Sequence, residues 1–148
     1  MGKQVTIAPY NAAFFRLYET FYNVLHRDLG SDGFRIWKQV LRDGLFLAYD
    51  SSGAKRLGGV EEFFKFVGER DAGVGLNVSF EKTADGFIYR FFTDPFPGLK
   101  GRIDWNDLVD SYLAPKTAYF LGPDWSYRTT KHRWDGAECT EHVFVRKS

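Results

Sequence analysis

The C-terminal segment holds the side chains best suited to covalent or metal chemistry. TTKHRWDGAECTEHVFVRKS, residues 129–148, contains the only cysteine, Cys139, together with His132 and His142. A cysteine acts as a nucleophile in its thiolate form, which a neighbouring protonated imidazole stabilises. Cysteine and histidine are also common ligands of zinc. The segment is therefore a candidate for a catalytic nucleophile or a metal site.

The same segment has the pattern of a β-hairpin, which decides which side chains can meet. Residues 135–136, Asp-Gly, suit a two-residue type I′ turn. That register places His132 opposite Cys139, with Cβ atoms about 4.5–5.5 Å apart. Glu141 follows on the same face, whereas His142 points to the other face because side chains alternate along a strand. The pattern disfavours a metal site, and it makes Cys139, His132 and Glu141 the candidate catalytic residues.

An inert cysteine is the alternative interpretation of the same pattern. Val143 and Val145 share the face of Cys139 in this register. Apolar neighbours favour burial, and a buried cysteine behaves as a small hydrophobic residue. Both interpretations stay open on the sequence alone.

The elements that would position these residues follow from hydrophobic periodicity. Apolar residues recur at helical spacing in four segments and alternate in two hairpins. The expected helices span 10–29, 31–43, 60–70 and 104–113. Pro115 interrupts the last one, and the alternative is that PKTAYFLG adds another helical turn. The expected hairpins span 74–93 and 125–147. Gly44 is expected to end the second helix, and residues 45–58 run from an apolar stretch into an exposed connection.

This order predicts a single α+β domain over residues 1–148. The N-terminal helices come first, and two β-hairpins then form an antiparallel sheet with an amphipathic helix between them. A parallel doubly wound fold is not expected, because strands and helices do not alternate along the chain.

The aromatic content is the unusual feature of the composition. It reaches 18%, with 15 Phe, 8 Tyr and 4 Trp. An ordinary Phe-rich core explains this surplus, an aromatic-lined ligand cavity or a dimer face is the alternative, and composition alone does not separate them. The expected lining residues are Phe14, Tyr18, Phe21, Trp37, Phe63, Phe64, Phe87, Tyr89 and Phe91. A gate or a dimer face is expected from Trp105, Tyr112, Tyr119 and Trp125.

Charge and targeting signals exclude several classes of partner. The chain has 20 basic and 19 acidic residues and a net charge of +1. No basic stripe favours nucleic acid, and no polybasic run favours a membrane surface. The single cysteine fits a reducing compartment, and the N-terminus lacks a signal-peptide pattern, so a cytoplasmic protein is expected. No motif calls for a cofactor.

Two segments carry a resemblance to a known superfamily. An amphipathic helix, DWNDLVDSYLAPKTAYFLG, precedes a strand, a Gly turn and a cysteine in WDGAECTEHVFV. With the helices before it, this pattern resembles the 4-vinyl-reductase-like and 2-amino-thiazoline-4-carboxylate hydrolase-like domains over about residues 12–146. Members often carry Cys-Pro in the central loop, where this chain has Asp94-Pro95.

The resemblance implies a ligand-binding or sensor-type domain for a small apolar or aromatic molecule. The alternatives are a hydrolase acting on a small heterocycle or amide, and an interaction module that forms a homodimer.

Overall fold

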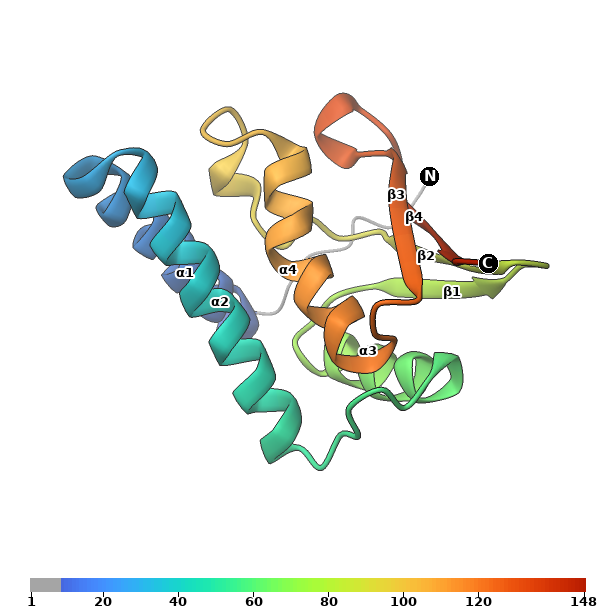
Figure 1. The fold of residues 1–148 in the computed structure, drawn as a ribbon. Helices are drawn as coiled ribbons and strands as arrows, with labels where there is room; N and C mark the ends of the chain where they lie inside the picture. Colours follow the sequence, from blue (N-terminus) through green and yellow to red (C-terminus); the bar gives the residue numbers. More distant parts are fainter. Residues whose placement is uncertain (1–8) are drawn as a thin grey trace.

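The computed structural model describes the backbone of residues 9–148 and the side chains of residues 13 and 15–148. The expected α+β class and the order of elements are confirmed (Figure 1). The elements are α1 (Pro9–Leu29), α2 (Ser31–Ser51), α3 (Val60–Gly73), β1 (Val78–Lys82), β2 (Gly86–Phe91), η1 (Pro97–Leu99), α4 (Trp105–Phe120), β3 (Trp125–Lys131), η2 (Arg133–Asp135) and β4 (Thr140–Arg146). Within residues 9–148, no helix is long and apolar enough to cross a membrane.

The four strands form one antiparallel sheet in the order β1-β2-β4-β3. The helices gather on one side of this sheet, with α4 between the sheet and the α1–α2 pair (Figure 1). Burial alternates along β2, where Phe87, Tyr89 and Phe91 are buried on the helix-facing side. Gly86 lets β2 start close to β4, because a Cβ there would lie 2.0 Å from the carbonyl oxygen of Phe144.

Helices α1 and α2 form a tight antiparallel hairpin. Gly33 lets them approach, because a Cβ at this position would lie 2.3 Å from the carbonyl oxygen of Leu25. The indole nitrogen of Trp37 on α2 donates to the carbonyl oxygen of Tyr18 on α1 at 3.0 Å. This hairpin places Tyr18 and the middle of α2 side by side.

The buried face of α1 differs from the expected one. Phe15, Glu19 and Tyr22 are buried, whereas Phe21 is 45% exposed and its expected place in the interior is wrong. The helix carries two apolar stripes about one residue apart, and periodicity alone cannot tell which of them meets α2.

Two residues expected to break helices lie inside them. α2 continues through Gly44 to Ser51, because Leu41 and Leu45 keep the same inward face beyond the glycine. α4 continues through Pro115 to Phe120. Burial of the flanking turns outweighs a local cost of about 1 kcal/mol for glycine and about 3 kcal/mol for proline.

The last hairpin has a longer connection than the expected two-residue turn. Thr129 pairs with His142 as expected, but the register then shifts, and Glu141 pairs with Lys131. Residues 132–139 form a loop that contains η2. The indole of Trp134 in this loop donates to Asp94 at 2.6 Å, which holds the loop against the segment before η1. The expected pairing of His132 with Cys139 across a tight turn is therefore wrong.

Candidate ligand cavity

A cavity of about 140 Å³ lies between the α1–α2 hairpin, the end of α3, β2 and α4. Five aromatic rings contribute to its wall: Phe15, Tyr18, Phe91, Phe96 and Tyr112. Gly44, which has no side chain, and Ala48, which has only a methyl group, leave room on the same wall where α2 passes. An apolar cavity of about 150 Å³ can hold benzene, so this one has room for a single ring.

Three buried polar side chains meet beside the cavity. Asp71 comes from the end of α3, Tyr89 from β2 and Lys116 from α4, and Asp71 and Lys116 line the cavity. The ammonium of Lys116 lies 3.3 Å from one oxygen of Asp71 and 3.4 Å from the hydroxyl of Tyr89. The hydroxyl of Tyr89 donates to the other oxygen of Asp71. The side chains of Lys116 and Asp71 are 7% and 4% exposed, so this ion pair is almost fully removed from water.

Aromatic rings complete the surroundings of Lys116. Its nitrogen lies 5.4 Å from the ring centroid of Phe91, 5.6 Å from that of Tyr89 and 5.9 Å from that of Tyr112. Cation–π contacts of this kind stabilise a desolvated ammonium by up to about 2 kcal/mol. The cavity thus carries a charge inside an apolar wall.

The tyrosine hydroxyls at this site keep their protons. Burial, followed by the charge of Asp71, raises the pKa of Tyr89 well above its usual value. Burial also raises the pKa of Tyr112, with the charges of Asp94 and Asp71 adding to the effect. Burial raises the pKa of Tyr18 too, and nearby Arg70 partly opposes this. These groups are therefore hydrogen-bond donors at neutral pH.

Arg70 adds a second cation to the cavity wall. It is half-buried on α3, and its guanidinium lies 5.3 Å from the ring centroid of Tyr49. It forms no ion pair with any carboxylate in the part of the chain whose side chains are described. The cavity wall therefore holds one carboxylate and two cations.

The aromatic residues expected to line a cavity have different positions. Tyr18 and Phe91 lie at the wall, and Tyr89 lies beside it in the polar cluster. Trp37 is fully buried, 5.8 Å from the ring of Tyr22, and it does not reach the cavity. The side chain of Phe14 lies outside the described residues.

The remaining expected residues form a filled aromatic core between α3 and the sheet. The ring centroid of Phe63 lies 5.3 Å from that of Phe87, and Phe64 lies 5.1 Å from Phe87. Tyr119 is 1% exposed and donates to Asp50 at 2.8 Å, so its expected place on a gate or dimer face is wrong. Tyr112 is also buried and lines the cavity.

Trp105 and Trp125, expected at the same gate or dimer face, are half-buried. The indole of Trp105 donates to Asp135 at 3.0 Å, and Trp125 packs 5.6 Å from the ring of Phe87. Both rings therefore make contacts within the chain.

Cys139 and His132 do not form a nucleophile pair. Cys139 is 1% exposed, and burial raises the pKa of its thiol. Burial lowers the pKa of His132, which stacks on Trp105 at 5.0 Å and accepts a hydrogen bond from the backbone of Trp134 at 3.0 Å. A neutral imidazole cannot stabilise a thiolate electrostatically, so the environment of Cys139 favours the inert thiol.

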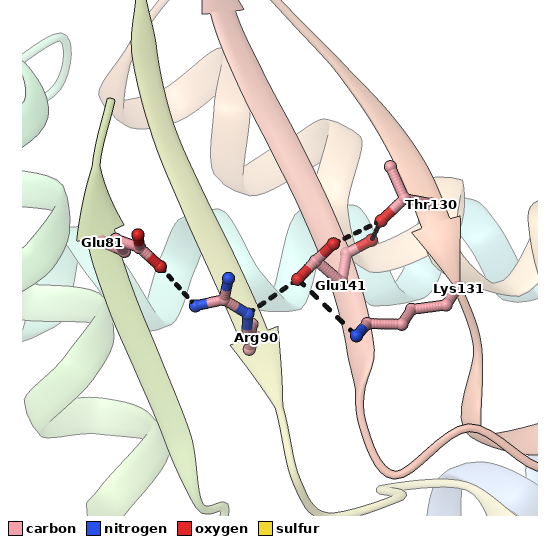
Figure 2. Close-up of polar contacts among 5 residues, drawn as sticks. All are labelled: Glu81, Arg90, Thr130, Lys131 and Glu141. Carbon is pink, nitrogen blue, oxygen red and sulfur yellow. Dashed lines mark hydrogen bonds and ion pairs between the residues drawn. The ribbon is translucent and has the colours of Figure 1, made fainter. Parts of the chain in front are cut away.

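Glu141 lies on the opposite, outward face of the sheet in a network of its own. The carboxylate of Glu141 accepts hydrogen bonds from Arg90 and from the hydroxyl of Thr130, each at 2.7 Å (Figure 2). The ammonium of Lys131 lies 4.0 Å from the same carboxylate. Arg90 also donates to Glu81 at 2.8 Å, so the network crosses all four strands. Hydrogen bonds from Thr130, then from Arg90, hold the pKa of Glu141 below its usual value. Glu141 therefore ties the strands together and does not join Cys139 in a site.

We predict that the thiol of Cys139 alkylates slowly. At neutral pH its reaction with iodoacetamide should be at least about tenfold slower than that of an exposed cysteine, because the thiolate is rare and the sulfur is buried. The matched reference is Ser52→Cys in a Cys139→Ala background, since Ser52 is exposed at the end of α2. Equal rates of modification, followed by mass spectrometry, would contradict the inert thiol.

Within the described residues, no three His, Cys, Asp or Glu side chains are placed to hold a metal ion. The chain matches no family model and no curated protein.

Proposed function

We propose that this chain binds one small, largely apolar or aromatic molecule in the cavity between its helices and sheet. The observation that carries the proposal is the aromatic wall of the cavity next to a buried Asp71–Lys116 pair. Ligand sites are usually apolar hollows with a few convergent polar groups, and this cavity has both. The resemblance to 4-vinyl-reductase-like domains implies the same class of function.

The buried ion pair supports a binding role for a second reason. Removing two charges from water costs several kcal/mol per ion, and hydrophobic residues of similar volume often replace such pairs without loss of stability. A chain that buries Lys116 and Asp71 at the wall of a hollow space keeps polar groups where they can orient a ligand.

The test is native mass spectrometry of the purified protein, compared with its denatured mass, followed by titration with toluene and phenol. We expect a retained small molecule or measurable binding of the single-ring probes. Ala48→Phe should weaken that binding at least about tenfold, because the introduced ring occupies the space of the ligand. Ala118→Phe is the control, since Ala118 is exposed on α4 and does not line the cavity.

Circular dichroism and a single unfolding transition must show that both variants fold. If neither probe binds and no molecule is retained, or if Ala48→Phe binds as well as the parent, the proposal is wrong.

A homodimeric interaction module is the second candidate, and one surface favours it. Leu17, Phe21 and Val24 follow one face of α1 at helical spacing and are 59%, 45% and 40% exposed. Exposed apolar stripes of this kind often mark protein interfaces. The same native spectrum distinguishes the candidates, because a bare dimer supports the module and a ligand-loaded chain supports the binding domain.

The hydrolase alternative receives less support. Its expected nucleophile, Cys139, is buried and does not line the cavity. A carboxylate mechanism would have to use Asp71, whose oxygens already accept from Lys116 and Tyr89.

A further inference from the structure

The side-chain polar groups around the cavity are mostly hydrogen-bond donors. Arg70 and Lys116 carry cationic donors, and the hydroxyl of Tyr112 keeps its proton because burial raises its pKa. Tyr112 makes no side-chain hydrogen bond with any residue of the described region. The one carboxylate at the wall, Asp71, already accepts from Lys116 and Tyr89 through its two oxygens. The wall therefore offers cationic and hydroxyl donors to a ligand, and its one carboxylate has little acceptor capacity left.

The charges at the wall also favour a ligand that carries hydrogen-bond acceptors. Lys116 is neutralised by Asp71 at 3.3 Å, which leaves the guanidinium of Arg70 without a carboxylate among the side chains that the structure describes. Arg70 is half-buried, so its charge is only partly solvated by water. A hydrocarbon in the cavity would displace some of that water without offering the guanidinium a hydrogen-bond acceptor in its place.

We infer that the ligand is a single-ring aromatic or similarly sized apolar acid, whose carboxylate binds Arg70. This inference rests on the proposed function, since it assigns a ligand class to the same cavity. The volume of about 140 Å³ holds one ring among Tyr18, Phe91 and Phe96. The planar guanidinium of Arg70 matches a carboxylate with two parallel hydrogen bonds.

The position of Arg70 places the acid group of the inferred ligand at the edge of the cavity. Lys116 is buried and held by Asp71 and Tyr89, whereas Arg70 keeps partial contact with solvent. A carboxylate at Arg70 keeps part of its own hydration, while the ring leaves water entirely. The desolvation cost is thus smaller than it would be for an acid buried against Lys116 alone.

Three probes of nearly the same shape test the inference by calorimetric titration at pH 7. Benzoate, benzamide and benzamidine share one ring, and their functional groups carry charges of about −1, 0 and +1 at this pH. We expect benzoate to bind most tightly and benzamidine most weakly. The affinity for benzoate should also fall as salt is added, because salt screens a half-exposed ion pair.

The variant Arg70→Gln locates the effect. It should weaken benzoate binding by about 10- to 100-fold, the loss of a charged hydrogen-bond pair, and change the affinity for toluene by less than about threefold. Arg128→Gln is the matched control, because Arg128 is exposed on β3. Arg70→Lys keeps the charge but loses the planar fork, so it should retain only part of the affinity for benzoate.

The outcomes separate this inference from the proposal on which it rests. If toluene and benzamide bind in the cavity as tightly as benzoate, or Arg70→Gln leaves benzoate unaffected, the acid is excluded and the binding function stands. If benzamidine binds most tightly, Asp71 sets the preference and the inference is overturned. If no probe binds, the proposed function itself fails.

Discussion

Replacing Lys116 by methionine should lower the free energy of unfolding by about 3–5 kcal/mol, one of the largest losses that a single substitution can cause in this chain. Methionine fills a similar volume and keeps the contacts with Phe91 and Tyr112, so the loss comes from the charge. Asp71 is 3% exposed, and without the ammonium its carboxylate stays buried with only the hydroxyl of Tyr89 as a donor. Urea unfolding at pH 7, monitored by circular dichroism, measures the difference.

Two further variants test this explanation. Lys65→Met removes a lysine that is exposed on α3, and it should change stability by no more than about 0.5 kcal/mol. The double variant Asp71→Asn/Lys116→Met removes both charges, so it should be more stable than Lys116→Met alone. A cost below about 1 kcal/mol for Lys116→Met, or no gain in the double variant, would mean that the buried pair is not held as two charges.

Periodicity predicts most of the elements of this fold, and it does less well where tertiary contacts outweigh local preferences. The alternation in residues 74–93 correctly predicts a hairpin of β1 and β2, but β1 begins at Val78 and residues 74–77 lie outside it. The spacing in 104–113 correctly predicts the start of α4. Gly44 and Pro115 were expected to end helices because of their backbone chemistry. In the structure both lie on helices whose next turns are packed against the core, and packing decides the helix ends.

The polar part of the cavity was missed, although the sequence carries a signal for it. Phe63, Val67 and Asp71 follow one another at intervals of four, so the carboxylate continues a buried apolar stripe of α3. Tyr112 and Lys116 have the same relation on α4. A charged residue at the end of an apolar stripe indicates a buried, paired charge. The expected helices ended at residues 70 and 113, which left Asp71 and Lys116 outside both stripes.

In the C-terminal segment, the conformation of the backbone decides whether the reactive side chains come together. A type I′ turn needs positive φ at both Asp135 and Gly136. Gly136 has φ 90°, but Asp135 lies in η2 without a positive φ, and the loop closes around Trp134. The tertiary contact between Trp134 and Asp94 could not be read from local spacing. In this loop conformation His132 stacks on Trp105, and it does not pair with Cys139.

His142 should make the protein lose stability as the pH falls below about 6.5. Its side chain is fully buried among the rings of Tyr89 and Phe91, and burial, followed by the positive charge of Lys116, lowers its pKa to about 3. His132 adds to this lowering and Glu141 opposes it. The Nδ1 atom lies 2.9 Å from the hydroxyl of Thr129, and Nε2 has no hydrogen-bond partner within the described residues.

The sign of the effect follows from the two pKa values. In the unfolded chain the imidazole takes up a proton near pH 6.5, whereas in the folded chain it stays neutral until the pH approaches 3. The contribution of His142 is therefore complete above pH 6.5 and is lost progressively between pH 6.5 and 3. Each pH unit in that window costs about 1.4 kcal/mol, so the loss at pH 4.5 should be about 2–3 kcal/mol.

Urea unfolding between pH 7.5 and pH 4.5 measures this slope, and His142→Gln isolates it. The variant loses stability at every pH because its amide is buried in place of the imidazole, but its stability should fall less steeply below pH 6.5 than that of the parent. His26→Gln is the control for the loss of a histidine, since His26 is exposed on α1. Equal slopes for the parent and His142→Gln would mean that His142 already accepts its proton in the folded chain, and the space around Nε2 would then have to admit water or an acceptor.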